Sequence, residues 1–123
     1  MGHHKSVIIR KERRRNRSKK TSFAHLSRNR LVVHRSLKHF EAQIINDFEG
    51  HTILSASSKS KDLKPALKSI KSKIDLSKKV GEVLAAKAKK MKIKSVVLDR
   101  NGYPYHGRVK AFVESVRKNG LNL

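Results

Sequence analysis

The apolar residues of this chain are unevenly distributed. The block from Arg10 to Lys20 has no apolar face, so burial cannot offset the entropy lost in ordering it. From Leu31 onward, apolar positions recur with the spacings of strands and helices. We therefore interpret residues 1–29 as an arm and residues 30–123 as a single globular domain. We expect the arm to be disordered or fraying alone and helical on its partner, because Arg and Lys tolerate helix well.

Three short runs in the first half of the domain predict strands, at residues 31–35, 40–48 and 52–57. In the second run, Phe40, Ala42 and Ile44 alternate with polar residues, which is the period-two pattern of a half-buried strand. The connections are short, and Glu49-Gly50-His51 is typical of a turn. The pattern therefore predicts an antiparallel meander of three strands.

The second half of the domain predicts two helices with a strand between them. Residues 59–75 are rich in lysine and interrupted by Pro65, which favours a loop with a weak helical turn. A helical spacing starts at Ser77, and residues 95–98 form a short apolar run typical of a buried strand. Apolar residues at i, i+3, i+4 and i+7 from Val109 predict a final amphipathic helix.

The predicted fold class is α/β (α+β), with the element order βββαβα preceded by a basic N-terminal arm. A three-stranded antiparallel meander is followed by a crossover helix, a further strand and a C-terminal helix. We expect the crossover to bring the last strand beside an earlier one, with the helices packed on one face of the sheet.

Charge identifies the class of partner. The 123 residues include 31 Lys and Arg against 9 Asp and Glu, a net charge of +22. Residues 1–40 carry 13 of these bases and residues 59–94 another 13, whereas residues 41–58 carry three acids and no base. Self-repulsion of this size opposes compaction unless a polyanion screens it, so nucleic acid is the first candidate.

The composition also excludes several kinds of site. Without cysteine there is no disulfide, zinc ribbon or iron–sulfur centre, and the seven histidines have no metal-binding spacing. We expect no cofactor and no small-molecule substrate. Apolar runs are too short for a membrane span, so we expect a cytoplasmic protein without a membrane partner. The alternative is that the Arg-rich N-terminus is an organellar transit peptide. Its cleavage would remove much of the charge assigned to binding.

Catalysis needs carboxylates brought together, and the nine acids are scattered. Asp99, at the end of the predicted last strand, is the only one placed like an active-site residue. A metal-dependent nuclease using Asp99 is therefore one hypothesis. The other is a turn or helix-capping acid that pairs with Arg100 or Arg108, and we favour it because Asp99 has no partner carboxylate in the sequence.

The segment from Asp99 to Val109 combines glycine, proline, two tyrosines, a histidine and two arginines between a strand and a helix. Asn101-Gly102 suits positive φ, and Pro104 stiffens the loop. Two readings stay open for its side chains. In one, the tyrosines cap the core and the arginines are solvated. In the other, these residues contact RNA.

Two stretches resemble the family of the bacterial-type large-subunit ribosomal protein number eighteen. Residues 30–43, RLVVHRSLKHFEAQ, are similar to the family's first two strands, and residues 99–109 with Ala111 are similar to its loop signature. Lys79-Val80-Gly81 is similar to the start of its crossover helix. The chain departs from the family pattern at Asn29, where proline is usual, and in its lysine-rich residues 59–75.

The resemblance implies a non-enzymatic protein that binds 5S rRNA and helps attach it to 23S rRNA in the central protuberance of the large ribosomal subunit. It also implies contact with the neighbouring large-subunit protein number five. A DNA-compacting basic protein is the rival reading, which rests on charge alone and leaves the Asp99–Val109 loop without a purpose.

The residues expected to contact RNA fall into three groups. The Lys and Arg residues of the arm would neutralise phosphates. Polar residues of the first two strands and of the loop would fix the position of the protein along the RNA. They are Arg10, Lys11, Arg13, Arg14, Arg15, Arg17, Lys19 and Lys20 in the arm; Arg28, Arg30, His34, Arg35, Ser36, Lys38 and Gln43 around the strands; and Tyr103, Tyr105, His106 and Arg108 in the loop.

Overall fold

A four-stranded sheet carries the body of the protein in a computed structural model that describes residues 2–19 and 28–123. The strands are β1 (Asn29–Arg35), β2 (Phe40–Asn46), β3 (His51–Ser57) and β4 (Val96–Asp99). Their order across the sheet is β3-β2-β1-β4. β1 pairs antiparallel with β2 and β2 with β3, whereas β4 lies parallel to β1. The predicted meander and the return of the last strand beside an earlier one are confirmed.

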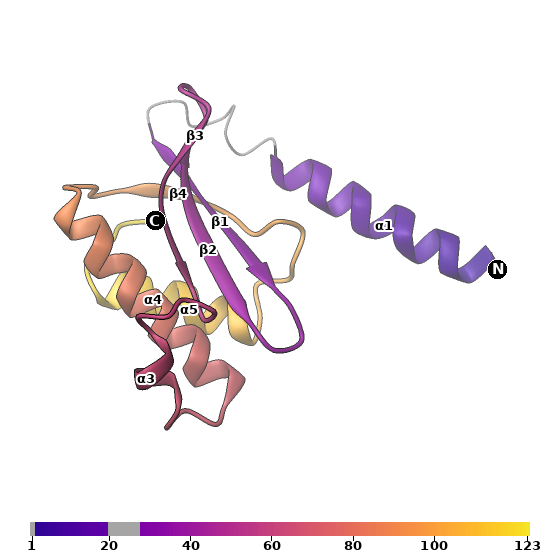
Figure 1. Ribbon diagram of the computed structural model, residues 1–123. Coiled ribbons are helices and arrows are strands. Elements are labelled where there is room, and N and C mark those ends of the chain that lie inside the picture. The colour runs from indigo at the N-terminus through magenta and orange to yellow at the C-terminus, as the bar shows by residue number, and fades with distance from the viewer. Residues whose placement is uncertain (1, 20–27) are drawn as a thin grey trace.

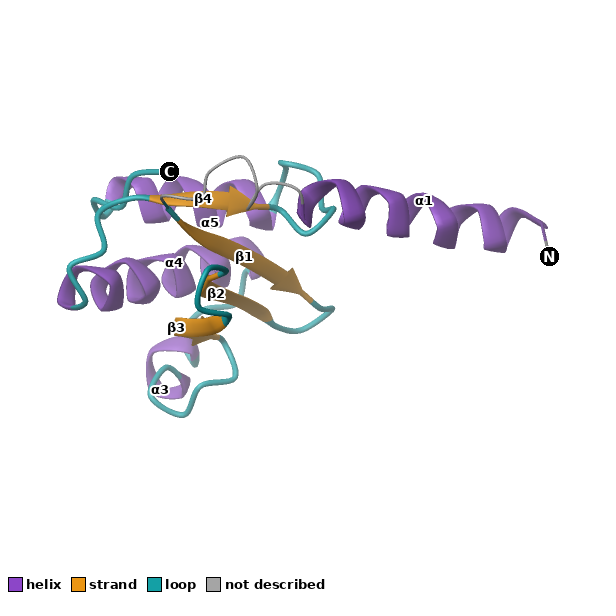
Figure 2. Cartoon of the chain, turned by 90° about the horizontal axis from the view of Figure 1, so that it is seen from above, coloured by secondary structure: helices purple, strands orange, loops and turns teal. Residues whose placement is uncertain are grey.

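The helices are α1 (Gly2–Lys19), α3 (Lys64–Leu67), α4 (Lys73–Lys90) and α5 (Arg108–Lys118). α4 is the crossover from β3 to β4, and α5 follows β4. Figure 2 shows α4 and α5 together on one side of the sheet. α1 projects away from the body, with its C-terminal end nearest the sheet (Figure 1).

The core lies between one face of the sheet and the two long helices. Alternate residues of β1 and β2 are buried, including Leu31, Phe40 and Ile44, which are fully buried. Phe112 of α5 packs against Phe40, with ring centroids 5.0 Å apart. The opposite face carries residues from the other phase of the strands and is more exposed, so the sheet presents one open side. This is the one-sided burial that the period-two pattern predicts.

α4 and α5 approach each other closely at Gly81. A Cβ there would lie 3.0 Å from the Phe112 carbonyl oxygen and 3.1 Å from the Ser115 Cβ. Ser115 donates a 2.7 Å hydrogen bond to the Lys78 carbonyl across the same contact. A side chain at position 81 would require the two helices to move slightly apart, which favours glycine at this close approach.

Several predicted boundaries were displaced, each for a local reason. β2 ends at Asn46 rather than at residue 48, because the Asn46 side chain accepts hydrogen bonds from the backbone N–H of Phe48 and Glu49 and starts the turn. α4 begins at Lys73 rather than at Ser77, because the hydroxyl of Ser72 caps it by accepting from the Ile74 N–H at 3.2 Å. The weak helical turn expected within residues 59–75 is α3.

The arm is helical along α1; the expectation that it frays without its partner stays a prediction. Asn29, which stands where the resembled family usually has proline, is the first residue of β1 and pairs with Val96 of β4. The chain therefore enters the sheet directly at Asn29.

Candidate nucleic-acid interface

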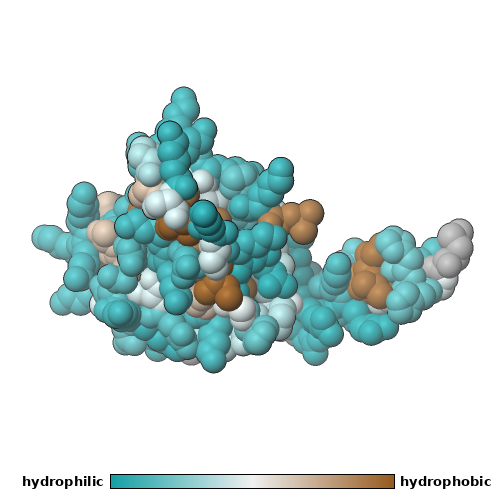
Figure 3. Space-filling view, turned by 90° about the horizontal axis from the view of Figure 1, so that it is seen from below, coloured by the Kyte–Doolittle hydropathy of each residue, from teal (hydrophilic) through white to brown (hydrophobic). Residues whose placement is uncertain are grey.

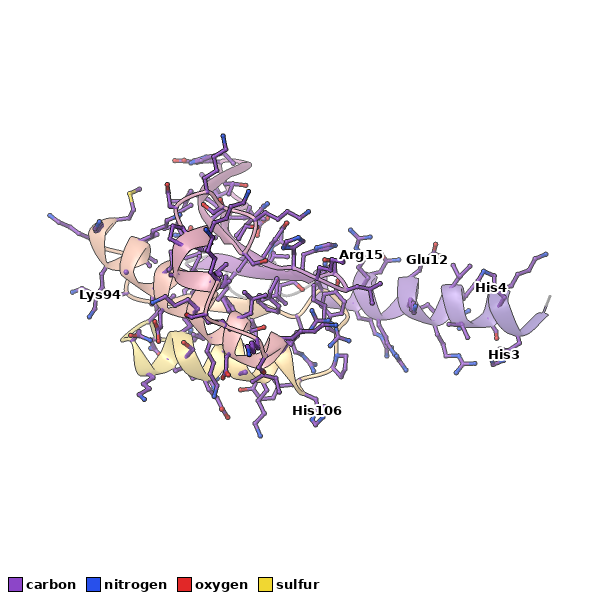
Figure 4. All side chains as sticks on the ribbon, turned by 60° about the horizontal axis from the view of Figure 1, so that its bottom comes forward. His3, His4, Glu12, Arg15, Lys94 and His106 are labelled. Carbon is purple, nitrogen blue, oxygen red and sulfur yellow. The ribbon has the colours of Figure 1, made fainter. Side chains whose placement is uncertain are left out.

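The Lys and Arg side chains of the arm are exposed to solvent as far as Arg17. All residues from Ile8 to Arg17 are exposed, including the predicted contact residues Arg10, Lys11, Arg13, Arg14, Arg15 and Arg17. Lys19 lies in the last turn of α1, and the expected contact at Lys20 falls outside the described residues. Figure 4 shows the side chains of α1 radiating around the helix, with His3 and His4 at its free end and Arg15 where it meets the body.

The C-terminal part of α1 lies against the loop between β4 and α5. A Cβ at Gly102 would come within 3.0 Å of the Arg15 backbone nitrogen, and Gly102 has φ +82°, so only glycine suits this position. A groove of about 690 Å³ opens beside this contact. It is lined by Arg14, Arg17, Leu98, Arg100, Gly102, Tyr103 and Pro104.

Three guanidinium groups therefore border one groove, two from α1 and one from the loop. Guanidinium groups bind phosphate through paired N–H donors, and an aromatic wall suits the face of a base. Arg100 was not among the predicted contact residues, although its place in the Asp99–Val109 segment was a signal for it. Because Arg100 lines the same groove as Arg14 and Arg17, it is a further candidate for phosphate contact.

The loop is held in shape by hydrogen bonds among its own residues. Asp99 Oδ1 accepts a 2.9 Å hydrogen bond from the Asn101 N–H, and Tyr103 N–H donates to the Arg100 carbonyl at 3.0 Å. Asn101 and Gly102 both have positive φ, as the Asn-Gly pair predicts. Arg100 and Tyr103 are therefore presented from a preformed turn.

Tyr103 joins the loop to the end of β1. Its hydroxyl accepts a 3.4 Å hydrogen bond from the Arg35 N–H and lies 3.3 Å from the Arg35 carbonyl, to which it donates. The Arg35 guanidinium lies 4.8 Å from the centroid of the Tyr103 ring, within the range of a cation–π interaction. Arg108 donates a 2.7 Å hydrogen bond to the Ser36 carbonyl in the same region. The reading in which the tyrosine caps the core holds for Tyr103, which packs against the core cluster.

Tyr105 and His106 lie further out on the loop. Tyr105 is 37% exposed, and its hydroxyl accepts a 3.5 Å hydrogen bond from Arg117. His106 is exposed and lies on the outer side of the body in Figure 4. Both side chains are more exposed than that of Tyr103, which is partly buried.

Arg30 forms ion pairs within the body. Its Nη1 lies 2.7 Å from Asp99 Oδ2 and its Nε lies 2.9 Å from Asp47 Oδ2. The hydrogen bond with Asp47 is the main influence that raises the pKa of Arg30; burial opposes it, and Asp99 adds to it. A raised pKa means that this stabilisation is present at every pH below the ordinary arginine value and is lost only above it. Arg30 is therefore a charged structural link among β1, β4 and the β2–β3 turn.

Asp99 is a turn acid rather than a catalytic one. It is 2% exposed, and its two carboxylate oxygens accept hydrogen bonds from Arg30 and from the Asn101 backbone. The turn role is confirmed, but the partner expected from sequence, Arg100 or Arg108, was wrong because β1 brings Arg30 alongside β4. In the described part of the chain, no three His, Asp or Glu side chains gather as a metal site would require.

The remaining predicted contacts are spread over the exposed surface. His34 and Gln43 lie on the open face of the sheet, and Lys38 lies in the turn between β1 and β2 with Ser36. Arg28 is exposed just before β1. These residues do not converge on the arginine groove, although the end of β1 approaches the loop through Arg35 and Tyr103.

The lysine-rich segment forms a second basic region. A hollow beside α3 is lined by His39, Ser58, Lys59, Lys64, Leu67 and Lys68. His39 Nδ1 lies 3.0 Å from the Ser58 hydroxyl, which also accepts from the Phe40 N–H. In Figure 3 this part of the molecule rises from the body as a hydrophilic projection.

Comparison with known families decides the class of protein. Residues 5–123 match the family model described as "Ribosomal L18 of archaea, bacteria, mitoch. and chloroplast". The chain belongs to this family. The large ribosomal subunit protein uL18 of Caldicellulosiruptor saccharolyticus is 46% identical over 123 residues, covering 98% of each chain. That of Chloroherpeton thalassium is 47% identical over 117 residues (95% and 96% covered), and that of Staphylococcus haemolyticus is 54% identical over 92 residues (75% and 74% covered).

Membership of the uL18 family makes this chain a structural, non-enzymatic component of the large subunit of the cytoplasmic ribosome. Its partners are accordingly ribosomal RNA and ribosomal proteins. Among the described helices, none is long and apolar enough to span a membrane.

Proposed function

We propose that this protein binds 5S rRNA through α1 and the β4–α5 loop, and that it attaches this RNA to 23S rRNA in the central protuberance. The observation that carries the proposal is the groove in which Arg14 and Arg17 of the arm meet Arg100 and Tyr103 of the body. Charge alone would permit any polyanion. A groove assembled from two elements adds a shape that a folded RNA can match.

The arm and the loop would contribute to binding in different ways. The arm supplies exposed cations that can follow a phosphate backbone. The loop is fixed to β1 by Tyr103 and Arg35, so it can set the register in which the arm lies. The tyrosine wall of the groove suits stacking on a base from a single-stranded or bulged segment.

Attachment to 23S rRNA requires a second cationic surface. Lys59, Lys64 and Lys68 line a hollow beside α3, and α3 lies at the far end of the body from α1 (Figure 1). Because the two surfaces are separate, one can engage 5S rRNA while the other meets a second RNA segment. Contact with large-subunit protein number five is part of the same proposal and rests on the family resemblance.

The test is a comparison of ligands at one ionic strength. The full chain is titrated into 5S rRNA, into duplex DNA of equal length and into an RNA hairpin of unrelated shape. We expect nanomolar affinity for 5S rRNA and at least tenfold weaker binding to the other two. Equal affinity for 5S rRNA and duplex DNA would overturn the proposal and favour the DNA-compacting reading.

A further inference from the structure

The turn between β2 and β3 presents an aromatic side chain that the fold does not use. Phe48 is 91% exposed, the most exposed large apolar side chain of the described residues. The turn forms the upper tip of the body in Figure 1, beyond the pairing of β2 with β3. An exposed phenylalanine at a projecting tip contributes nothing to the core and is exposed at a cost in hydration free energy.

The backbone of this turn is fixed on both sides of Phe48. Asn46 Oδ1 accepts from the N–H groups of Phe48 and Glu49, and the Gly50 N–H donates to the Asn46 carbonyl at 2.8 Å. Asp47 is held by Arg30 through two hydrogen bonds, at 2.9 and 3.0 Å. Little conformational entropy of the backbone remains to be lost when Phe48 enters a partner, which favours binding.

The charge around Phe48 is opposite to that of the rest of the molecule. Asp47 and Glu49 flank it, and residues 41–58 contain three acids and no Lys or Arg in a chain of net charge +22. The Glu49 side chain is 61% exposed, while the Arg30 charge is shared between Asp47 and Asp99. A phosphate backbone approaching this tip would meet carboxylates, so RNA is disfavoured there.

We propose that the β2–β3 turn is a protein-docking tip, in which Phe48 inserts into an apolar pocket of a neighbouring large-subunit protein whose rim carries Lys or Arg. The ring of Phe48 is the anchor, and the negative charges of Asp47 and Glu49 favour a pocket with a basic rim. Anchors of this kind, an aromatic in a pocket with charged residues around it, dominate the energy of protein interfaces. The inference is independent of which RNA the arm binds.

The turn between β1 and β2 offers a matched comparison. Leu37 is 81% exposed at its tip, but its neighbours are Arg35, Lys38 and His39 rather than acids. The two tips therefore share an exposed apolar residue and differ in local charge. We expect the Leu37 tip to face RNA and the Phe48 tip to face protein.

Site-specific photocrosslinking distinguishes the two. The full chain carrying a benzophenone amino acid in place of Phe48, or in place of Leu37, is incorporated into large subunits, which are purified and irradiated. We expect the Phe48 position to crosslink to a protein, at a peptide containing Lys or Arg, and the Leu37 position to crosslink to rRNA. A Phe48 position that crosslinks to rRNA alone, or to nothing, would overturn the proposal.

Two substitutions separate this inference from the proposed RNA function. Phe48→Ser should leave the affinity of the purified chain for 5S rRNA within twofold, yet should lower its share of large subunits severalfold when it competes with the unsubstituted chain. Phe48→Tyr, which keeps the ring, should restore most of that share. A fivefold loss of 5S rRNA affinity in Phe48→Ser, or equal incorporation of both chains, would contradict the docking tip.

Discussion

α1 and the globular body are built on different principles, although they belong to one chain. The body buries a continuous cluster that includes Leu31, Phe40 and Phe112, and its buried side-chain polar atoms in the described residues all have hydrogen-bond partners. α1 buries almost nothing, has no acid in its first turn, and carries seven Lys or Arg between Arg10 and Lys19 against one Glu. Burial stabilises the body, whereas the order of α1 depends on helix propensity and on the screening of its charge.

In the described part of the chain, α1 meets the body beside the β4–α5 loop. Arg15 approaches the loop at Gly102, and the groove beside them joins arginines of both regions. This contact orients the arm relative to the body, although the arm has no hydrophobic core. We infer that the body orients the arm toward its polyanionic partner.

Removal of the arm should have the largest effect. Deletion of residues 1–22 takes away nine Lys and Arg with one Glu, and we expect the affinity for 5S rRNA to fall by about 1,000-fold at physiological salt. The body should still unfold cooperatively, as followed by circular dichroism on heating. The division at residue 29 stays a prediction until this is done, and a deletion that unfolds the body would refute it.

Truncation of a core residue should affect the body in the opposite way. Phe112→Ala removes a fully buried ring that packs on Phe40, so we expect a loss of about 3–5 kcal/mol in the free energy of unfolding. Urea denaturation measures this. Phe48→Ala is the matched control, because that ring is 91% exposed, and its change should stay within about 0.5 kcal/mol.

The ion pairs of Arg30 should contribute less than the core. Asp99→Asn keeps an oxygen for the Asn101 N–H but removes the charge opposite Arg30, which retains Asp47. We expect a destabilisation of roughly 1.5–3 kcal/mol. Asp62→Asn, at an exposed site, is the control and should change stability by less than about 0.5 kcal/mol. Equal effects of the two substitutions would show that the Arg30 link adds no stability.

The groove should show the smallest effect of the series. Arg100→Ala removes one guanidinium from it, and we expect 5S rRNA affinity to fall about threefold to tenfold with no loss of folding. Arg117→Ala is the control, since Arg117 bonds to Tyr105 and the Leu123 carbonyl at another site. Equal losses would mean that Arg100 acts through net charge and not through the groove.

Sequence reasoning recovered what depends on periodicity. The alternation of Phe40, Ala42 and Ile44 and the helical spacing from Val109 predicted the sheet, its buried face and the last helix. The crossover helix predicted that the last strand returns beside an earlier one, and the structure shows that this strand is β1. The loop was found through its residue types, since Asn101-Gly102 has the positive φ values it was expected to have.

The features that could not be predicted from the sequence depend on contacts between residues far apart in the chain. The link from Arg30 to Asp99 spans 69 positions and arises from strand register, which residue types alone did not specify. The same holds for the groove, in which Arg100 is joined by Arg14 and Arg17 of α1. Local side-chain hydrogen bonds, such as those of Asn46 and Ser72, shifted element boundaries by a few residues.

The salt dependence of 5S rRNA binding tests the central claim most directly. If about ten phosphates are neutralised, a log–log plot of affinity against salt concentration should have a slope of about −7 to −9 for the full chain. The chain lacking residues 1–22 should give a much shallower slope, because most of those contacts belong to the arm. Identical slopes for the two chains, or a full-chain slope near zero, would contradict the account.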